Sequence, residues 1–102
     1  MNKMSVYETI RDCLELHKGK NNPVTSAEVS DLIGIIEDDT HAQTRVLILD
    51  TANMYGLPLA ANNRGYYLIT SDSEYDEYMK NLDSRIEGIT QRKEIITKNY
   101  KR

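Results

Sequence analysis

The chain has no tryptophan and no phenylalanine, so seven tyrosines and four methionines must supply the bulk of its core. Its one cysteine, Cys13, excludes an internal disulfide and favours a reducing compartment. No run approaches the roughly 18 apolar residues of a membrane span, and the N-terminus lacks the apolar core of a signal peptide. These absences predict a cytoplasmic protein with no membrane segment, and 102 residues fit one domain.

Positive charge is also scarce, because 13 Lys and Arg stand against 16 Asp and Glu, a formal net charge of −3. Residues 1–72 carry 10 acidic and 6 basic side chains, a net charge of −4. Residues 73–102 carry 6 acidic and 7 basic side chains, a net charge of +1. A nucleic-acid-binding domain usually presents a basic face, and the first 72 residues have few cations with which to build one.

Signatures of catalysis and metal binding are missing too. The five glycines are scattered and form no phosphate-binding loop, and no Ser or Cys lies in a nucleophile motif. Cys13 and His17 lie one helical turn apart, but a structural zinc site wants four ligands. We therefore expect no enzyme activity, no cofactor and no metal.

Two helices are predicted in the first third of the chain. Ser5 with Glu8 forms a capping box at the start of the first, which ends near residues 18–23. Thr25 with Glu28 forms a second box, so the next helix begins at Ser26 and stops at Gly34.

A third helix and a hairpin follow. Helical spacing over residues 40–55 puts one set of side chains on a common face, and Gly56 ends the helix. That set is Ala42, Arg45, Ile48, Leu49, Ala52 and Tyr55. Asp38, Asp39 and Thr40 compete to cap the helix. Two strands are predicted, at residues 57–60 and 66–70, joined by the turn-forming residues 61–65. Leu57, Leu59, Tyr66 and Leu68 should face the helices, and Tyr67 and Ile69 the opposite side.

The last segment predicts a long helix, capped by Ser71 with Glu74 or by Ser73 with Asp76. Apolar residues recur there at alternating intervals of four and three, as in a coiled coil. Residues 74–100 make about 40 Å of helix, whereas a body of this size has a radius of gyration of only ~13 Å. We therefore expect part of the stripe to pair with a second copy. Lys93 and Gly88 favour a short antiparallel or bundle-like contact over a long zipper. The expected dimerisation residues are Met79, Leu82, Ile86, Ile89 and Ile96.

The sequence resembles winged helix-turn-helix domains of the biotin-repressor and DeoR type in three places. The second helix of that family resembles residues 24–34, its helix exit resembles residues 56–59, and its returning wing strand resembles residues 65–69. The resemblance spans roughly residues 5–70, and small phage and mobile-element proteins with a C-terminal helix are similar to the whole chain. It implies a mainly α fold with a β-hairpin, with a winged helix-turn-helix domain at 1–71 and a C-terminal helix at 72–102. It also implies that the chain binds double-stranded DNA, with the third helix in the major groove.

Two sets of side chains are candidates for DNA contact. The start of the third helix offers Thr40, His41, Gln43, Thr44 and Arg45, which can contact bases or phosphates; the alternative is a solvated polar face. The hairpin tip offers Asn62, Asn63 and Arg64, for which the alternative is ordinary turn chemistry.

Two functions remain open on the sequence. The first is a dimeric DNA-binding regulator or replication-associated factor of a phage or mobile element. The second is a protein-interaction module of the same fold, in which Val46 and Leu47 would anchor a host replication or transcription protein.

Overall fold

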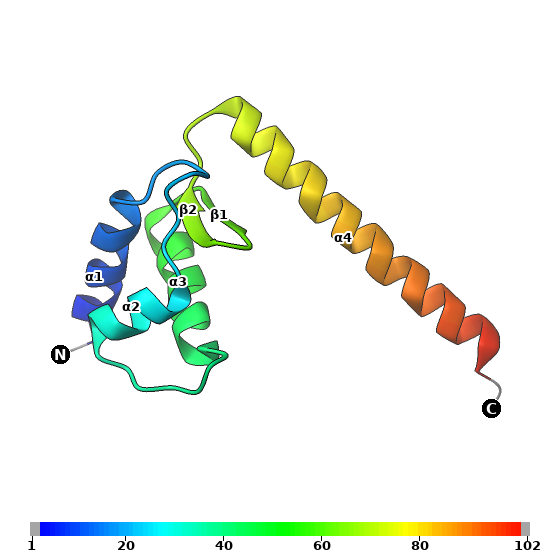
Figure 1. Ribbon diagram of the computed structural model, residues 1–102, viewed down its shortest axis with the longest axis horizontal. Coiled ribbons are helices and arrows are strands. Elements are labelled where there is room, and N and C mark those ends of the chain that lie inside the picture. The colour runs from blue at the N-terminus through cyan, green and yellow to red at the C-terminus, as the bar shows by residue number, and fades with distance from the viewer. Residues whose placement is uncertain (1–2, 101–102) are drawn as a thin grey trace. The chain divides into compact units, whose positions relative to one another are not determined.

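The structure, a computed structural model, describes residues 3–100 (Figure 1). Four helices and two strands follow the order ααα–ββ–α, and they form two units, residues 1–70 and 71–102. The predicted mainly helical fold with a hairpin and a long C-terminal helix is confirmed. The elements are α1 (Lys3–Glu15), α2 (Ser26–Ile33), α3 (Ala42–Tyr55), β1 (Leu59–Asn62), β2 (Gly65–Leu68) and α4 (Asp72–Asn99).

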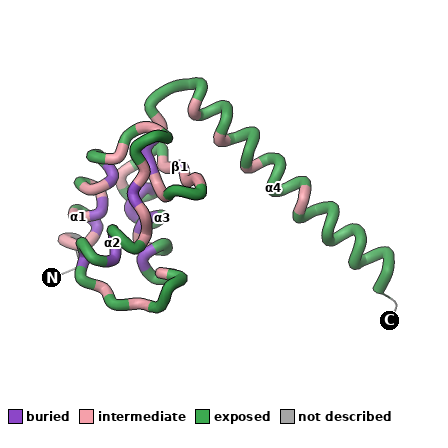
Figure 2. The backbone as a smooth tube through the Cα atoms, in the orientation of Figure 1, coloured by how far each residue is buried: buried purple, intermediate pink, exposed green. Residues whose placement is uncertain are grey.

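The first unit has one core, formed where α1, α2, α3 and β2 meet (Figure 2). Ile10 and Leu14 of α1 and Ile48 of α3 are completely buried in it. Burying one such side chain contributes about 1.5–3 kcal/mol, so these aliphatic residues replace the missing large aromatics. The other members of the core are Val24, Val29, Ile33 and Leu68.

The hairpin is tighter than the sequence suggested. β1 and β2 are antiparallel, with Leu59 opposite Leu68 and Asn62 opposite Gly65, so the turn is only Asn63 and Arg64. The predicted strands at 57–60 and 66–70, with a five-residue loop, were therefore shifted. Side chains on both faces of β2 are buried, because Leu68 belongs to the core and the adjacent Tyr67 is buried as well.

The segment between α1 and α2 also pairs with β2, which the sequence did not indicate. The Val24 and Tyr66 backbones exchange two hydrogen bonds of 2.8 Å, and the Gly19 N–H donates to the Leu68 carbonyl at 2.8 Å. This turn-rich segment therefore satisfies the outer edge of β2 and ties the hairpin to the start of α2.

Helix caps agree with the sequence at α2 and α4. The Thr25 hydroxyl accepts the Glu28 N–H, and the Glu28 carboxylate accepts the Thr25 N–H, which completes the predicted box. Of the two caps predicted for α4, Ser71 is the one used, since its hydroxyl accepts the Glu74 N–H at 3.1 Å.

The caps predicted for α1 and α3 were wrong. α1 begins at Lys3, so Ser5 lies inside the helix, where its carbonyl accepts the Thr9 hydroxyl. At α3 the residue before the helix is His41, in the left-handed region with φ 51° and no side-chain cap. The N–H groups of the first turn are instead satisfied by the Glu37 carboxylate from the preceding loop.

The buried face of α3 also differs from the prediction. Its buried residues are Thr44, Ile48, Thr51 and Ala52, whereas Leu49 is exposed. Arg45 is also exposed, as expected of a candidate for DNA contact. Two threonines, Thr44 and Thr51, lie on the side of α3 that faces the core, and both hydroxyls are hydrogen-bonded there. A prediction from hydropathy alone therefore assigned the buried face of α3 incorrectly.

α4 forms the second unit, and none of its residues is buried. Among the residues that the structure describes, no helix combines the length and apolarity required to cross a membrane.

Candidate nucleic-acid interface

A hollow of about 300 Å³ lies in the first unit where α2, α3 and the hairpin tip meet. Arg45 reaches it from α3 and Arg64 from the hairpin turn, while Thr25 and Ser26 line it from the start of α2. Two arginines from separate elements therefore line one surface recess of a chain whose net charge is negative.

The hairpin tip is held in place by Asn62. Its side-chain oxygen accepts the Arg64 N–H at 2.8 Å, and its side-chain nitrogen donates to the Lys20 carbonyl at 3.2 Å. Gly65 has φ 139°, and a Cβ at this position would clash with the Val24 carbonyl. Turn chemistry thus explains Asn62 and Gly65, whereas the side chains of Asn63 and Arg64 remain exposed.

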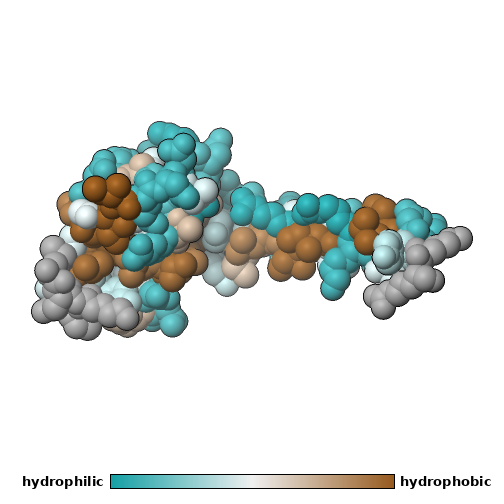
Figure 3. Space-filling model, turned by 90° about the horizontal axis from the view of Figure 1, so that it is seen from below, coloured by the Kyte–Doolittle hydropathy of each residue, from teal (hydrophilic) through white to brown (hydrophobic). Residues whose placement is uncertain are grey.

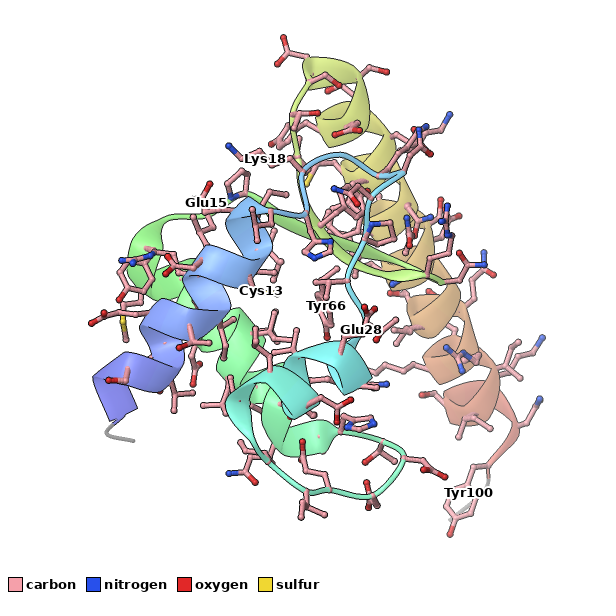
Figure 4. The ribbon with its side chains drawn as sticks, turned by 60° about the vertical axis from the view of Figure 1, so that its left-hand side comes forward. Cys13, Glu15, Lys18, Glu28, Tyr66 and Tyr100 are labelled. Carbon is pink, nitrogen blue, oxygen red and sulfur yellow. The ribbon has the colours of Figure 1, made fainter. Side chains whose placement is uncertain are left out.

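The start of α2 forms another wall of the hollow. Tyr66 of β2 lines the recess together with Thr25, and Figure 4 shows Tyr66 on the side of β2 near the first turn of α2. The backbone N–H of Thr25, helped by its hydroxyl, lowers the pKa of Glu28, which therefore stays ionised. The sequence did not identify Thr25, Ser26 or Tyr66 as site residues, because their approach depends on the pairing of Val24 with Tyr66.

A polar network at the start of α3 takes up the Thr44 side chain, while Gln43 and Arg45 beside it are exposed. Thr44 is completely buried, its hydroxyl donates to Glu37, and it lies 2.6 Å from the Ser30 hydroxyl oxygen. The His41 Nδ1 lies 3.0 Å from the same Ser30 oxygen. The expectation that Thr44 is exposed and available for base contact was therefore wrong: this side chain joins α3 to α2.

Negative charge surrounds the same helix start. The Thr44 hydroxyl is the main cause of a lowered pKa at Glu37, and the Thr40 hydroxyl lowers the pKa of Asp38. Both carboxylates are therefore ionised near neutral pH. Carboxylates at a helix N-terminus complement its dipole, but they repel phosphates.

The structure separates the predicted contact residues into two groups. Arg45, Asn62, Asn63 and Arg64 line the hollow together. Thr40 and Gln43 are exposed and His41 is half-buried, but these three side chains lie outside its lining.

The outer face of α3 also carries apolar side chains. Val46 and Leu49 lie one turn apart, and each is 57 % exposed. Leu47, which the sequence suggested as a partner anchor, is half-buried and packs against the core. Isolated exposed apolar residues are common, but two on consecutive turns of one helix form a patch that a partner can cover.

Within residues 3–100, no group of three or more His, Cys, Asp or Glu side chains is placed to hold a metal ion. Cys13 is half-buried, and burial raises the pKa of its thiol, which disfavours the thiolate that binds metals. The His17 ring pairs with the Asn22 carbonyl at 3.0 Å.

The geometry is that of a recess with two arginines, flanked by an acidic helix start and an apolar helix face. Comparisons of the chain with protein families, with curated proteins and with solved structures found no match.

Proposed function

We propose that this protein is a cytoplasmic DNA-binding regulator or replication-associated factor of a phage or mobile element, acting as a homodimer. In this proposal the first unit is a winged helix-turn-helix domain and the β1–β2 hairpin is its wing. α3 approaches the major groove, and a backbone phosphate occupies the recess between Arg45 and Arg64.

The observation that carries the proposal is that those two arginines, one from α3 and one from the hairpin turn, line the same recess. A guanidinium group presents a planar set of N–H donors that matches a phosphate, and two of them compensate for the scarcity of other cations. The first turn of α2 adds Thr25 and Ser26 to the wall, and helix N-termini favour anions.

The acidic start of α3 sets the expected strength of binding. Ionised Glu37 and Asp38 oppose phosphate approach, so few contacts contribute and one domain binds weakly. Two domains held by paired α4 helices double the contacts and read two half-sites, which is how a dimer reaches useful affinity.

The test is a fluorescence anisotropy titration of full-length protein onto labelled duplex DNA from upstream of its own gene, at about 50 mM and 200 mM salt. We expect a salt-sensitive affinity that Arg45→Ala and Arg64→Ala each weaken. Lys80→Ala is the matched control, because it removes an exposed cation from α4 and should leave affinity unchanged. No salt-dependent binding, or equal losses in all three variants, would contradict the proposal.

A second candidate is supported by the exposed pair Val46 and Leu49. In this case the α3 face docks on a host replication or transcription protein, and the two arginines are incidental. The candidate predicts that Val46→Ser with Leu49→Ser abolishes capture of a purified partner, whereas Arg45→Ala with Arg64→Ala does not. The reverse pattern, measured on DNA, supports the first candidate.

A further inference from the structure

α4 carries a stripe of side chains that are apolar except for Lys93, and none of the residues of this helix is buried. Ile86, Ile89 and Ile96 are 62 %, 52 % and 64 % exposed, and Figure 3 shows apolar side chains gathered along one side of this helix. The stripe has alternating spacings of four and three over its whole length. Its positions are Tyr75, Met79, Leu82, Ile86, Ile89, Lys93, Ile96 and Tyr100.

The two halves of α4 have opposite charge. Residues 72–85 contain five acidic and two basic side chains, a net charge of −3. Residues 86–99 contain two acidic and three basic side chains, a net charge of +1. A parallel pair would place each half beside the same half of the other copy, so that like charges meet. An antiparallel pair places the acidic half of one copy beside the basic half of the other.

Lys93 makes the same distinction within the stripe. In a parallel pair in register, Lys93 would face the Lys93 of a second copy across the seam, and two like charges would have to be held in contact. In an antiparallel pair centred between residues 87 and 88, Lys93 faces Leu82, next to Asp83. Its long stem can then cover apolar surface while its ammonium group lies near a carboxylate.

We propose that α4 pairs with the α4 of a second copy in antiparallel orientation, about a two-fold axis beside Gly88. The spacing of the stripe reads the same in both directions about this centre. Each residue therefore faces the residue of the other copy whose number, added to its own, gives 175. The facing pairs are Ile86 with Ile89, Met79 with Ile96, and Tyr75 with Tyr100. The inference deepens the dimer of the proposed function and does not require that the dimer bind DNA.

This arrangement also fixes the distance between the starts of the two α4 helices. The same symmetry puts the first residues of the two α4 helices 31 residues apart along the pair, about 46 Å at ~1.5 Å per residue.

Disulfide trapping tests the orientation on the full-length chain. Two differently tagged proteins, Met79→Cys and Ile96→Cys, are made in a Cys13→Ala background, because Cys13 is the chain's one cysteine. The antiparallel register brings positions 79 and 96 together, whereas two copies of position 79 lie 17 residues apart, about 26 Å. A disulfide needs Cα atoms within about 7 Å, so only the mixed pair can form one.

We expect oxidation to give the mixed-tag dimer from the mixture and no dimer from either protein alone. The matched control is Lys80→Cys mixed with Glu94→Cys, which lie within one residue of the same height but outside the stripe and should not cross-link. A dimer of Met79→Cys with itself would overturn the antiparallel orientation.

Sedimentation of the unmodified chain separates this failure from that of the underlying dimer. We expect a dimer mass. A monomer mass would overturn both the orientation and the dimer of the proposed function, whereas a dimer mass with self-linked Met79→Cys overturns the orientation alone. Failure of DNA binding with correct mixed linking leaves the α4 pairing intact and contradicts only the proposed DNA contact.

Discussion

The buried hydroxyl of Thr44 is the perturbation that tests the polar network between α2 and α3. Thr44→Val keeps the shape of the side chain and removes one oxygen. Ser30 is 1 % exposed and Thr44 is 0 % exposed, so water cannot replace the lost partner at the 2.6 Å contact between them. Glu37 loses a hydroxyl donor at the same time.

The expected cost follows from what remains after the substitution. Ser30 keeps the Glu37 carboxylate and the His41 ring as partners, so no buried group is left unpaired. Thr44→Val instead removes two hydrogen bonds, one to Ser30 and one to Glu37; at about 0.5–1.5 kcal/mol each, we expect a cost of about 2 kcal/mol. Each kcal/mol lowers the melting temperature of a domain of this size by about 4–8 °C. Near-ultraviolet circular dichroism during thermal and urea unfolding measures the change, because it reports packed tyrosines such as Tyr7 and Tyr67.

Thr51→Val is the matched control, since Thr51 is also 0 % exposed and lies on the same helix. Its hydroxyl donates to the Leu47 carbonyl, which belongs to the same helix, so its removal leaves no buried donor without an acceptor. We expect the control to cost less than about 1 kcal/mol. Equal losses in the two variants would refute the assignment of a stabilising network. Adding Ser30→Ala to Thr44→Val should cost less than the sum of the single changes.

Three further predictions concern local structure. Because the pKa of Glu37 is lowered in the fold, its stabilising contribution is fully present above its ordinary value of 4.5 and is lost as pH falls through the lowered value. Glu37→Gln should therefore lose stability at neutral pH, and the difference from the parent should shrink on acidification in urea unfolding; a pH-independent difference would contradict this. Thr25→Ala should cost about 1 kcal/mol because it removes the α2 cap, and Thr25→Ser should restore most of the loss in the same assay. Gly65→Ala should destabilise the chain by more than about 1 kcal/mol, because φ 139° and the Val24 carbonyl both oppose a Cβ, whereas Asn63→Ala should leave the midpoint nearly unchanged.

Local signals in the sequence predicted much of the fold. The pairing of Thr25 with Glu28, the stop at Gly34 and the cap at Ser71 depend on residues within one turn of each other. The tertiary features were not visible in this way. Glu37 caps α3 across six positions, and Val24 pairs with Tyr66 across more than forty, so neither contact has a local pattern.

The site could be predicted only in part for the same reason. Arg64 stood out because a turn does not require an arginine, and it does line the recess. Thr44 was misplaced because a threonine at a helix start usually suggests solvent, whereas here its hydroxyl is satisfied by Ser30 and Glu37. The Thr25 and Ser26 wall of the recess follows from the packing of the hairpin against α2, which no single segment encodes.

The slope of DNA affinity against salt concentration tests the central proposal most directly. Each phosphate neutralised contributes about 0.9 to the slope of log affinity against log salt on duplex DNA. If Arg45 and Arg64 grip one phosphate in each domain of the dimer, the double variant Arg45→Ala with Arg64→Ala should reduce the magnitude of that slope by about 1.8, and its loss of affinity should be smaller than the sum of the single losses. An unchanged slope in the double variant would contradict the account, because the recess would then hold no phosphate.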